Sequence, residues 1–299
     1  MKILSGKDVS LNVYNSLSTR IKRLKNSKIT PSLAVILVGE NPASAVYVRS
    51  KAKIFKQLNL YSKTFTFPDN VTAIDLLSLI NKLNQDPQYH GILVQMPLPK
   101  HIDSQKIIDS ISPKKDVDGF HPQNVGLLTM GNPRFIPCTP KGIMRILKYY
   151  SISLEGKHVV VIGRSNIVGR PISILCSHKG ESKNATVTIC HSGSRNISKY
   201  TSLADVVVVA LGVPNFLSAE MVKKDVIIID VGINRVESDK TLKGYKLVGD
   251  ADFNSLKNIV SSITPVPGGV GPMTIAMLVE NTIESAEAMY LNKTNSKRP

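Results

Sequence analysis

The stretch HVVVIGRSNIVGRP, residues 158–171, decides the fold of the second half of the chain. It opens with a run of β-branched residues, which is typical of a strand that is buried on both faces of a parallel sheet. Gly163 follows this run directly, and Gly169 and Pro171 stand where a helix can begin, because proline is tolerated in a first helical turn. The stretch therefore predicts a strand, a tight glycine turn and a helix.

Further apolar runs of the same kind follow downstream. They are ATVTIC at 185–190, ADVVVVALG at 204–212 and DVIIIDVG at 225–232, with helical or loop spacers between them. This alternation predicts a parallel sheet with its connecting helices, and hence a Rossmann-like dinucleotide-binding domain of the α/β class. We assign this domain to residues 138–274.

The glycine turn matches a dinucleotide-binding loop only in part. Ser165 and Val168 occupy the second and third glycine positions of the usual G-x-G-x-x-G pattern, so a turn without a ligand is an equally good interpretation of this stretch alone. The next strand ends in CHSGSR, where an enzyme for NAD often carries an acid. Ser192 and Arg195 stand there instead, and together with Arg164 they suit a 2′-phosphate through charge-assisted hydrogen bonds. We therefore predict NADP as the cofactor; the alternative is that both arginines are solvated surface charges.

The first half of the chain shows a similar alternation. Strands are predicted at 32–39, at 61–67 and at the start of 91–99, where the end of the strand carries Gln95 into a proline-punctuated loop; helical patterns at 44–58 and 72–84 lie between them. The βαβ rhythm indicates a second α/β layer with a mostly parallel sheet.

The boundary between the two halves is marked by composition. Residues 112–124 and 135–142 are rich in proline, glycine, aspartate and asparagine, and we interpret them as crossover loops. Residues 1–137 and 275–299 then form the first domain. Near its start, Asp8 stands where a helix N-cap is expected. The apolar stripe of that helix is Val9, Val13, Leu17, Ile21 and Leu24.

Composition limits the class of protein. A chain of 299 residues with 42% hydrophobic content can bury a large core, and its formal net charge of +16 fits nucleic-acid binding, small anionic ligands or a basic proteome. Its cysteines and histidines show neither a disulfide framework nor metal-ligand spacing, so we assign no metal. Because no apolar run approaches a membrane span and no secretory signal is visible, we expect a cytoplasmic protein without a membrane partner.

Tyr47 and Lys51, in the segment YVRSK, are candidates for chemistry. Their spacing of four residues places the phenol and the amine on one face of the predicted helix, where they can share a proton. An ordinary exposed pair on an amphipathic helix is the commoner meaning of this spacing.

The stretch ITPVPGGVGPMT, residues 263–274, precedes an apolar helical run. Its glycines allow the backbone to approach a flat ligand closely, and a helix N-terminus after Pro272 supplies free N–H donors. The alternative is a rigid interdomain turn.

Taken in order, several segments resemble the bifunctional methylenetetrahydrofolate dehydrogenase/cyclohydrolase family, the FolD type, from about residue 3 to about residue 285. They are GENPASAVYVRSKAK, GILVQMPLP, KDVDGFHPQNVG, FIPCTPKGI, GRSNIVGRP, DVGIN and TPVPGGVGPMT. The resemblance implies two α/β domains that flank a cleft, with NADP on the second and folate against the first, in a homodimer. It also implies oxidation of 5,10-methylenetetrahydrofolate to the 5,10-methenyl form, with a hydride passed to NADP⁺, and then addition of water to give 10-formyltetrahydrofolate.

The resemblance assigns roles to individual residues. Lys51 is similar to the family's catalytic lysine, Tyr47 to its partner tyrosine near the folate rings, and Gln95 to the glutamine that contacts the lysine. Asp118 matches the acid that anchors the pterin amino group, while Asp116 is expected to be structural. The implied cofactor-binding positions are Gly163, Arg164, Ser165, Ile167, Ser192, Arg195 and Ile233. The implied substrate-binding positions are Tyr47, Lys51, Gln95, Asp118, Pro267, Gly268 and Gly269.

A chemical hypothesis follows for Lys51. Hydride departure leaves a cationic N–C–N centre, so oxidation needs alignment rather than a strong base, whereas hydrolysis needs control of protons. We expect the pKa of Lys51 to be lowered by burial beside a cationic intermediate, so that the amine helps to activate water or relays its proton. Tyr47 and Gln95 would fix its direction.

Three alternatives stay open. A family member can be a dehydrogenase only, although the match at Lys51, Gln95 and Asp118 argues against this. Short-chain dehydrogenases also carry Y-x-x-x-K, but their glycine loop comes first, whereas here the pair lies well before Gly163. A basic nucleic-acid-binding α/β protein is disfavoured by the 5% aromatic content and by the lack of a recognisable binding motif, so no nucleic-acid partner is expected.

Overall fold

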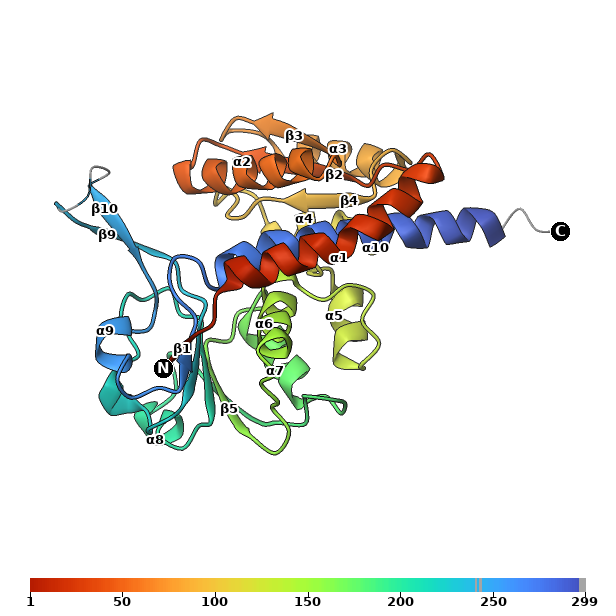
Figure 1. Cartoon of the computed structure of the whole chain (residues 1–299). Helices are drawn as coiled ribbons and strands as arrows, with labels where there is room; N and C mark the ends of the chain where they lie inside the picture. The colour runs from red at the N-terminus through yellow and green to blue at the C-terminus, as the bar shows by residue number, and fades with distance from the viewer. Residues whose placement is uncertain (240, 242–243, 296–299) are drawn as a thin grey trace. The chain divides into compact units, whose positions relative to one another are not determined.

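The computed structural model describes residues 1–239, 241 and 244–295, and these form two compact units (Figure 1). The six-stranded unit contains Met1–Asn12 and Thr139–Thr274. The three-stranded unit contains Val13–Cys138 and Ile275–Pro299.

The six-stranded unit is built on a wholly parallel sheet, as the apolar runs predict. In spatial order its strands are β1 (Lys2–Ile3), β11 (Ser262–Ile263), β8 (Ile227–Asp230), β7 (Val206–Val209), β5 (His158–Ile162) and β6 (Thr186–Cys190). Apart from His158 and Asp230, strands β5, β7 and β8 consist of β-branched residues, and almost all of their residues are buried, as is typical of a parallel sheet that is covered on both faces.

Strand β5 is the point at which the strand order reverses. The chain passes from β5 to β6 on one side, and β7 then lies on the other side of β5, with Val160 aligned to both Thr188 and Val207. In open α/β sheets, ligands bind outside the carboxyl ends of the strands at such a reversal. The turn after β5 and the loop after β7 are therefore placed where a ligand is expected.

Helices and a hairpin complete the six-stranded unit. The helical segments are α6 (Cys138–Tyr149), α7 (Gly169–Ser177), α8 (Ser198–Thr201), α9 (Phe253–Leu256) and the 3-10 helix η1 (Ala219–Met221). The antiparallel hairpin consists of β9 (Asn234–Glu237) and β10 (Tyr245–Val248). Pro171 lies in the first turn of α7, as the sequence predicts.

The three-stranded unit has a parallel sheet in the order β3 (Tyr61–Phe67), β2 (Ser32–Val38), β4 (Gly91–Val94). Every residue of the central strand β2 is buried, whereas the edge strand β3 alternates in exposure. One face of the sheet packs on α3, which contributes Leu76, Ile80 and Leu83 to the core.

Six helices of the described residues belong wholly or largely to this unit. They are α1 (Gly6–Asn26), α2 (Pro42–Gln57), α3 (Ala73–Gln85), α4 (Ser104–Ser110), α5 (Pro122–Thr129) and α10 (Val270–Asn295). Across the ranges that the structure covers, no helix combines the length and the apolar character that crossing a membrane requires.

Three helix starts differ from the sequence predictions. Asp8 is not an N-cap, because α1 begins at Gly6 and the backbone N–H of Asp8 donates to Ser5 Oγ at 3.4 Å; Ser5 is the capping side chain. Neither predicted crossover loop is a loop throughout, because α5 begins at Pro122 within 112–124, and α6 begins at Cys138 within 135–142 and tolerates Pro140 in its first turn. The predicted apolar stripe of α1 is buried, as expected.

The N-terminus also joins a different unit from the one that the sequence division gave it. Residues 1–12 belong to the six-stranded unit because β1 pairs in parallel with β11, Lys2 aligning with Ser262. A strand of two residues has no hydrophobic period, so no pattern marks this pairing in the sequence.

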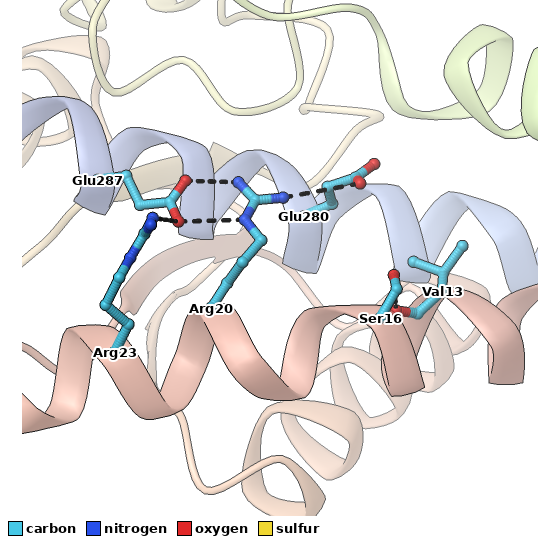
Figure 2. A network of polar contacts seen from close by, with 6 residues as sticks. All are labelled: Val13, Ser16, Arg20, Arg23, Glu280 and Glu287. Atoms are coloured by element: carbon cyan, nitrogen blue, oxygen red, sulfur yellow. Dashed lines mark hydrogen bonds and ion pairs between the residues drawn. The ribbon is translucent and has the colours of Figure 1, made fainter.

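Helices α1 and α10 lie side by side within the three-stranded unit and are joined by ion pairs (Figure 2). Arg20 donates from Nε and Nη2 to the two carboxylate oxygens of Glu287, at 3.1 and 2.6 Å. Arg23 reaches the same carboxylate at 2.9 Å, and Glu280 lies 3.9 Å from Arg20. This bidentate geometry is the strong form of an arginine–carboxylate pair.

The network predicts a pH-dependent contribution to stability. Burial raises the pKa of Glu287, but Arg20 and Arg23 outweigh burial and hold that pKa below its ordinary value. A carboxylate with a depressed folded-state pKa contributes stability above its unfolded pKa and loses it as pH falls through the folded one. Glu287→Gln should therefore lower the free energy of unfolding at pH 7 by roughly 1 kcal/mol in urea titrations. The difference from wild type should shrink as pH falls below about 4.

Arg23→Gln is the comparison variant for this test, because it removes the more exposed of the two arginines that pair with Glu287. The Arg23 side chain is 72% exposed, so its loss should change the free energy of unfolding much less than loss of Glu287. An effect of Glu287→Gln that stays constant from pH 7 to pH 3 would contradict the assignment.

Candidate active site

Lys51 is held inside the three-stranded unit by the helix that carries it. On α2, Val48, Lys51 and Phe55 recur at helical spacing and form the inward face, and Lys51 is only 8% exposed. Its ammonium donates a hydrogen bond to Gln95 Oε1 at 3.0 Å. The sequence prediction of a contact between this lysine and this glutamine agrees with that geometry.

Gln95 is oriented by the sheet. It follows β4 directly, and its backbone N–H continues the sheet pairing by donating to Ile36 O at 2.9 Å. Its side-chain amide N–H donates to Met96 O at 2.8 Å. Because the amide nitrogen is engaged there, the amide oxygen is left to face Lys51.

Asp116 and Asp118 have different environments although they lie two residues apart. Asp116 is buried, and its carboxylate accepts from Phe120 N at 3.2 Å, His121 N at 2.8 Å and Asn124 Nδ2 at 2.8 Å. These bonds hold the turn that follows, so Asp116 is structural, as expected. Asp118 is partly buried and accepts a long hydrogen bond from the Cys138 thiol at 3.7 Å.

The charges of Lys51 and Asp118 are coupled. Burial lowers the pKa of Lys51, and the charge of Asp118 opposes this shift. Burial raises the pKa of Asp118 to about 6, against the opposing charge of Lys51. Each group is therefore closer to neutrality than it would be in water, which is the condition for exchanging protons near physiological pH.

Tyr47 lies one helical turn before Lys51 on α2. Its side chain is 39% exposed, so the helix presents an accessible aromatic surface on the side of the buried ammonium. An aromatic face of this kind can stack against a planar ring.

Two residues that support Asp118 carry no signal in the sequence. Asn281 on α10 is fully buried, and its amide N–H groups donate to Val117 O at 2.7 Å and Ile136 O at 3.0 Å. Cys138, which the sequence indicates only as a small core residue, places its thiol on Asp118. Both are long-range contacts, and local patterns do not report them.

The six-stranded unit has a tight turn at the carboxyl end of β5. Gly163 has a φ of +124°, and a Cβ atom there would collide with Ala210 O. A Cβ atom on Gly169 would collide with Gly163 O. Ser165 Oγ accepts from Val168 N at 3.2 Å and from Gly169 N at 3.4 Å, which closes the turn. Glycine is therefore required at both positions, and the turn leaves backbone that a phosphate group can approach.

The turn after β6 is fixed by its own hydrogen bonds. His191 N donates to Ser194 Oγ at 2.9 Å, and Gly193 N donates to His191 Nδ1 at 3.0 Å. Ser192 and Arg195 are left exposed, as is Arg164 on the turn after β5. A hydroxyl and two guanidinium groups without an acid suit a phosphorylated ribose, so the residues present fit NADP.

Exposed apolar side chains lie on the turn after β5 and on the loop after β8. Ile167 follows β5 and Ile233 follows β8, and both are exposed. Large apolar side chains on ligand-binding loops are available to contact a flat ring. Among the residues that the structure describes, no group of three or more His, Cys, Asp or Glu side chains is arranged to hold a metal ion.

The loop with Pro267, Gly268 and Gly269 belongs to the six-stranded unit, whereas Lys51 belongs to the three-stranded unit. Gly268 has a φ of +105°, and its carbonyl accepts from Gly6 N at 3.0 Å and from Lys7 N at 3.2 Å. The loop is thus packed on the start of α1. Its role in substrate binding stays a prediction.

Comparison with known proteins agrees with this geometry. The catalytic domain of tetrahydrofolate dehydrogenase/cyclohydrolase matches residues 4–118, and the NAD(P)-binding domain of the same enzymes matches residues 137–290. The chain is 50% identical over 288 residues to the bifunctional protein FolD of Prosthecochloris aestuarii, covering 95% of this chain and 98% of that protein.

Solved structures give the same result. The bifunctional enzyme FolD from Campylobacter jejuni superposes with a TM-score of 0.91 at 50% identity, over 97% of this chain and 99% of that one. The FolD enzyme of Trypanosoma brucei, solved with NADP cofactor and an inhibitor, has a TM-score of 0.91 at 34% identity, over 96% and 98% of the two chains.

The coupling between Lys51 and Asp118 can be measured directly. Lys51→Met removes the cation that holds down the pKa of Asp118, so that pKa should rise above about 6. The measurement is a ¹³C NMR titration of the aspartate carboxyl groups, with the Asp118 signal assigned by its loss in Asp118→Asn. The control is Lys53→Met on the exposed side of α2, which should leave the Asp118 titration unchanged. A pKa that stays the same or falls in Lys51→Met would show that the two charges are independent.

Proposed function

The chain belongs to the tetrahydrofolate dehydrogenase/cyclohydrolase family, and from this premise we infer that it is a bifunctional enzyme of one-carbon metabolism. It oxidises 5,10-methylenetetrahydrofolate to 5,10-methenyltetrahydrofolate with NADP⁺, and it hydrolyses that product to 10-formyltetrahydrofolate. The observation that carries this inference is the buried Lys51 on Gln95, electrostatically coupled to Asp118, in a chain that also carries a dinucleotide turn at Gly163.

We assign the cofactor to the six-stranded unit. Gly163 and Ser165 form the turn that accommodates its phosphates, and Ile167 and Ile233 supply apolar contacts. Ser192, Arg164 and Arg195 hold the 2′-phosphate. When bound, NADP⁺ supplies the hydride acceptor for the first reaction.

We assign the folate to the three-stranded unit, with Tyr47, Lys51, Gln95 and Asp118 as its contacts. Tyr47 offers its exposed ring to the planar substrate, and the Asp118 carboxylate accepts N–H groups of the pterin. This carboxylate has spare acceptor capacity, because its hydrogen bond comes from a weak thiol donor. We assign Pro267, Gly268 and Gly269 to the same substrate, on the evidence of the resemblance.

The first reaction does not require Lys51 as an acid or a base. Departure of the hydride leaves a cation that the two folate nitrogens stabilise themselves, so the protein's task is to align the donor carbon. Tyr47 and Asp118 perform that task in this proposal, since they fix the ring system at two points.

The second reaction needs a group that moves protons. Water adds to the methenyl carbon and loses a proton, and the carbon–nitrogen bond to N5 then breaks as N5 gains a proton. Lys51 suits both transfers, because its lowered pKa makes the neutral amine accessible and the resulting ammonium can return the proton. Gln95 directs the amine by its hydrogen bond.

We also propose a cytoplasmic homodimer whose formyl product serves purine biosynthesis, as the family resemblance implies. Part of the net charge of +16 attracts anionic substrates, namely the cofactor phosphates and the glutamate tail of folate. Sedimentation velocity of the purified chain tests the dimer.

Replacing Lys51 should separate the two activities. Lys51→Met should lower the hydrolysis of methenyltetrahydrofolate by about 100-fold or more, because the general acid–base group is lost, while NADPH formation persists in part. Wild-type and variant protein are incubated with 5,10-methylenetetrahydrofolate and NADP⁺ and NADPH formation is followed, while hydrolysis is followed separately at neutral pH by the loss of absorbance of supplied methenyltetrahydrofolate, with its uncatalysed hydrolysis subtracted.

Lys53→Met is the matched control, because it removes an exposed lysine from the same helix. It should leave both rates unchanged. Equal loss of both activities in Lys51→Met would contradict the assigned role, and wild-type protein that forms no NADPH would contradict the proposed function as a whole.

The 2′-phosphate contacts predict the cofactor preference. Arg195→Gln should raise the Kd for NADP⁺ about tenfold, because a charge-assisted hydrogen bond is lost, and should leave the Kd for NAD⁺ unchanged. Both constants are measured by isothermal titration calorimetry. Lys199→Gln on α8 removes an exposed cation nearby in the chain and serves as the control for loss of general positive charge. An equal rise in the Kd for NADP⁺ and in the Kd for NAD⁺ in Arg195→Gln would exclude a specific 2′-phosphate contact.

A further inference from the structure

A buried carboxylate that the function above does not use ties the loop after β7 in place. Asp250 is completely buried, and its Oδ2 accepts from the backbone N–H groups of Leu211 at 2.6 Å and Gly212 at 2.9 Å. Its Oδ1 accepts from Asn234 Nδ2 at 2.8 Å, at the start of β9. One side chain therefore joins the loops that leave β7 and β8.

A second buried carboxylate holds the first. Asp230, the last residue of β8, accepts from Asp250 N and Ala251 N, each at 3.0 Å, and from Gly232 N at 2.9 Å. Side chains at Gly232 or Gly249 would collide with these carboxylates, so the glycines are required for the approach. Asp250 cannot shift without breaking the contacts that Asp230 makes.

Backbone hydrogen bonds to Gly249 and Asp250 also hold the far end of the loop after β7. Asn215 N donates to Gly249 O at 3.0 Å, and Leu217 N donates to Asp250 O at 2.9 Å. The short stretch between these ties carries Val213, which is 46% exposed, and Ile233 on the neighbouring loop is 42% exposed. The two carboxylates thus present two apolar side chains on fixed backbone.

The position of these side chains suits one half of the cofactor. In the proposed function the 2′-phosphate lies at the end of β6 and the other phosphates at the turn after β5. Strands β7 and β8 continue the sheet beyond β5 on the side away from β6, so the remaining half of the molecule extends toward their ends. That half is the nicotinamide riboside, whose ring is flat.

Burying two carboxylates side by side is costly. Burial raises the pKa of Asp230 to about 7, even though three backbone N–H groups favour its charged form. Groups that are kept at such a cost are found where backbone must be held for function.

We propose that Asp250, supported by Asp230, is a positioning residue for the nicotinamide half of NADP⁺, because it fixes the loop 211–215 so that Val213 contacts that half. This inference rests on the proposed function. It assigns to Val213 a cofactor contact that the sequence does not indicate.

The test compares two ligands that share the adenosine half. Titration calorimetry of the full chain is carried out with NADP⁺ and with adenosine 2′,5′-bisphosphate, which lacks nicotinamide. Asp250→Ala should raise the Kd for NADP⁺ about tenfold and leave the Kd for the bisphosphate unchanged. Asp250→Asn should bind both nearly as wild type does, because an amide oxygen can still accept from Leu211 and Gly212 while Asn234 rotates to pair with the amide nitrogen.

Asp252→Ala is the matched control for lost stability. Asp252 lies two residues away and caps α9 by accepting from Asn254 N and Ser255 N, so its loss should lower the melting temperature without changing either Kd. Hydrolysis of supplied methenyltetrahydrofolate needs no NADP⁺ and should stay at the wild-type rate in Asp250→Ala.

Val213→Ser keeps the inference testable if Asp250→Ala does not fold, because Val213 is exposed and its change does not disturb the core. It should raise the Kd for NADP⁺ a few-fold and leave the Kd for the bisphosphate unchanged. Equal weakening of both ligands in Asp250→Ala, or unchanged NADP⁺ binding in both variants, would overturn the inference. Wild-type protein that binds neither ligand would overturn the proposed function and this inference with it.

Discussion

The desolvated ammonium of Lys51 is the group on which the candidate site in the three-stranded unit depends. An amine buried to this degree must find an acceptor and a compensating charge, or it loses its proton. Gln95 supplies the acceptor because β4 ends one residue before it, and Asp118 supplies the charge because a buried turn held by Asp116 brings it there. Asn281 then fixes that turn through two backbone carbonyls from a helix far away in the chain. The properties of the lysine depend on all of these contacts.

The hydrogen-bond donors around an aspartate carboxylate decide whether it holds a loop or is available to a ligand. Asp116, Asp230 and Asp250 each accept three hydrogen bonds from backbone or amide N–H groups, and each holds a loop. Asp118 instead accepts a hydrogen bond from a thiol, which is a weak donor, and burial without good donors raises its pKa. A carboxylate in that state gains more than the others do from N–H groups that a substrate brings. The same residue type therefore builds the scaffold at three places and is available for a ligand at the fourth.

Local patterns in the sequence were sufficient for the elements that bury long apolar runs. β2, β5 and β7 were predictable because parallel strands covered on both faces are almost entirely apolar. β1, β11 and the hairpin of β9 and β10 were not, since strands of two to four residues show no period. The roles expected for Lys51, Gln95 and Asp118 came from the family resemblance, and the contact of Lys51 with Gln95 agrees with them. Asn281, Cys138 and Asp250 act over long sequence separations, where neither spacing nor composition carries a signal.

The coupling between Lys51 and Asp118 links the protonation of the lysine to substrate binding in the proposed hydrolysis. Burial lowers the pKa of Lys51 and the charge of Asp118 opposes that shift, so the carboxylate opposes the loss of a proton from the ammonium. On the proposed roles, substrate N–H groups engage that carboxylate and spread its charge, while the methenyl centre adds a cation. Both changes lower the pKa of Lys51 further. The neutral amine then becomes accessible when the cationic substrate is bound, which is when water must lose a proton.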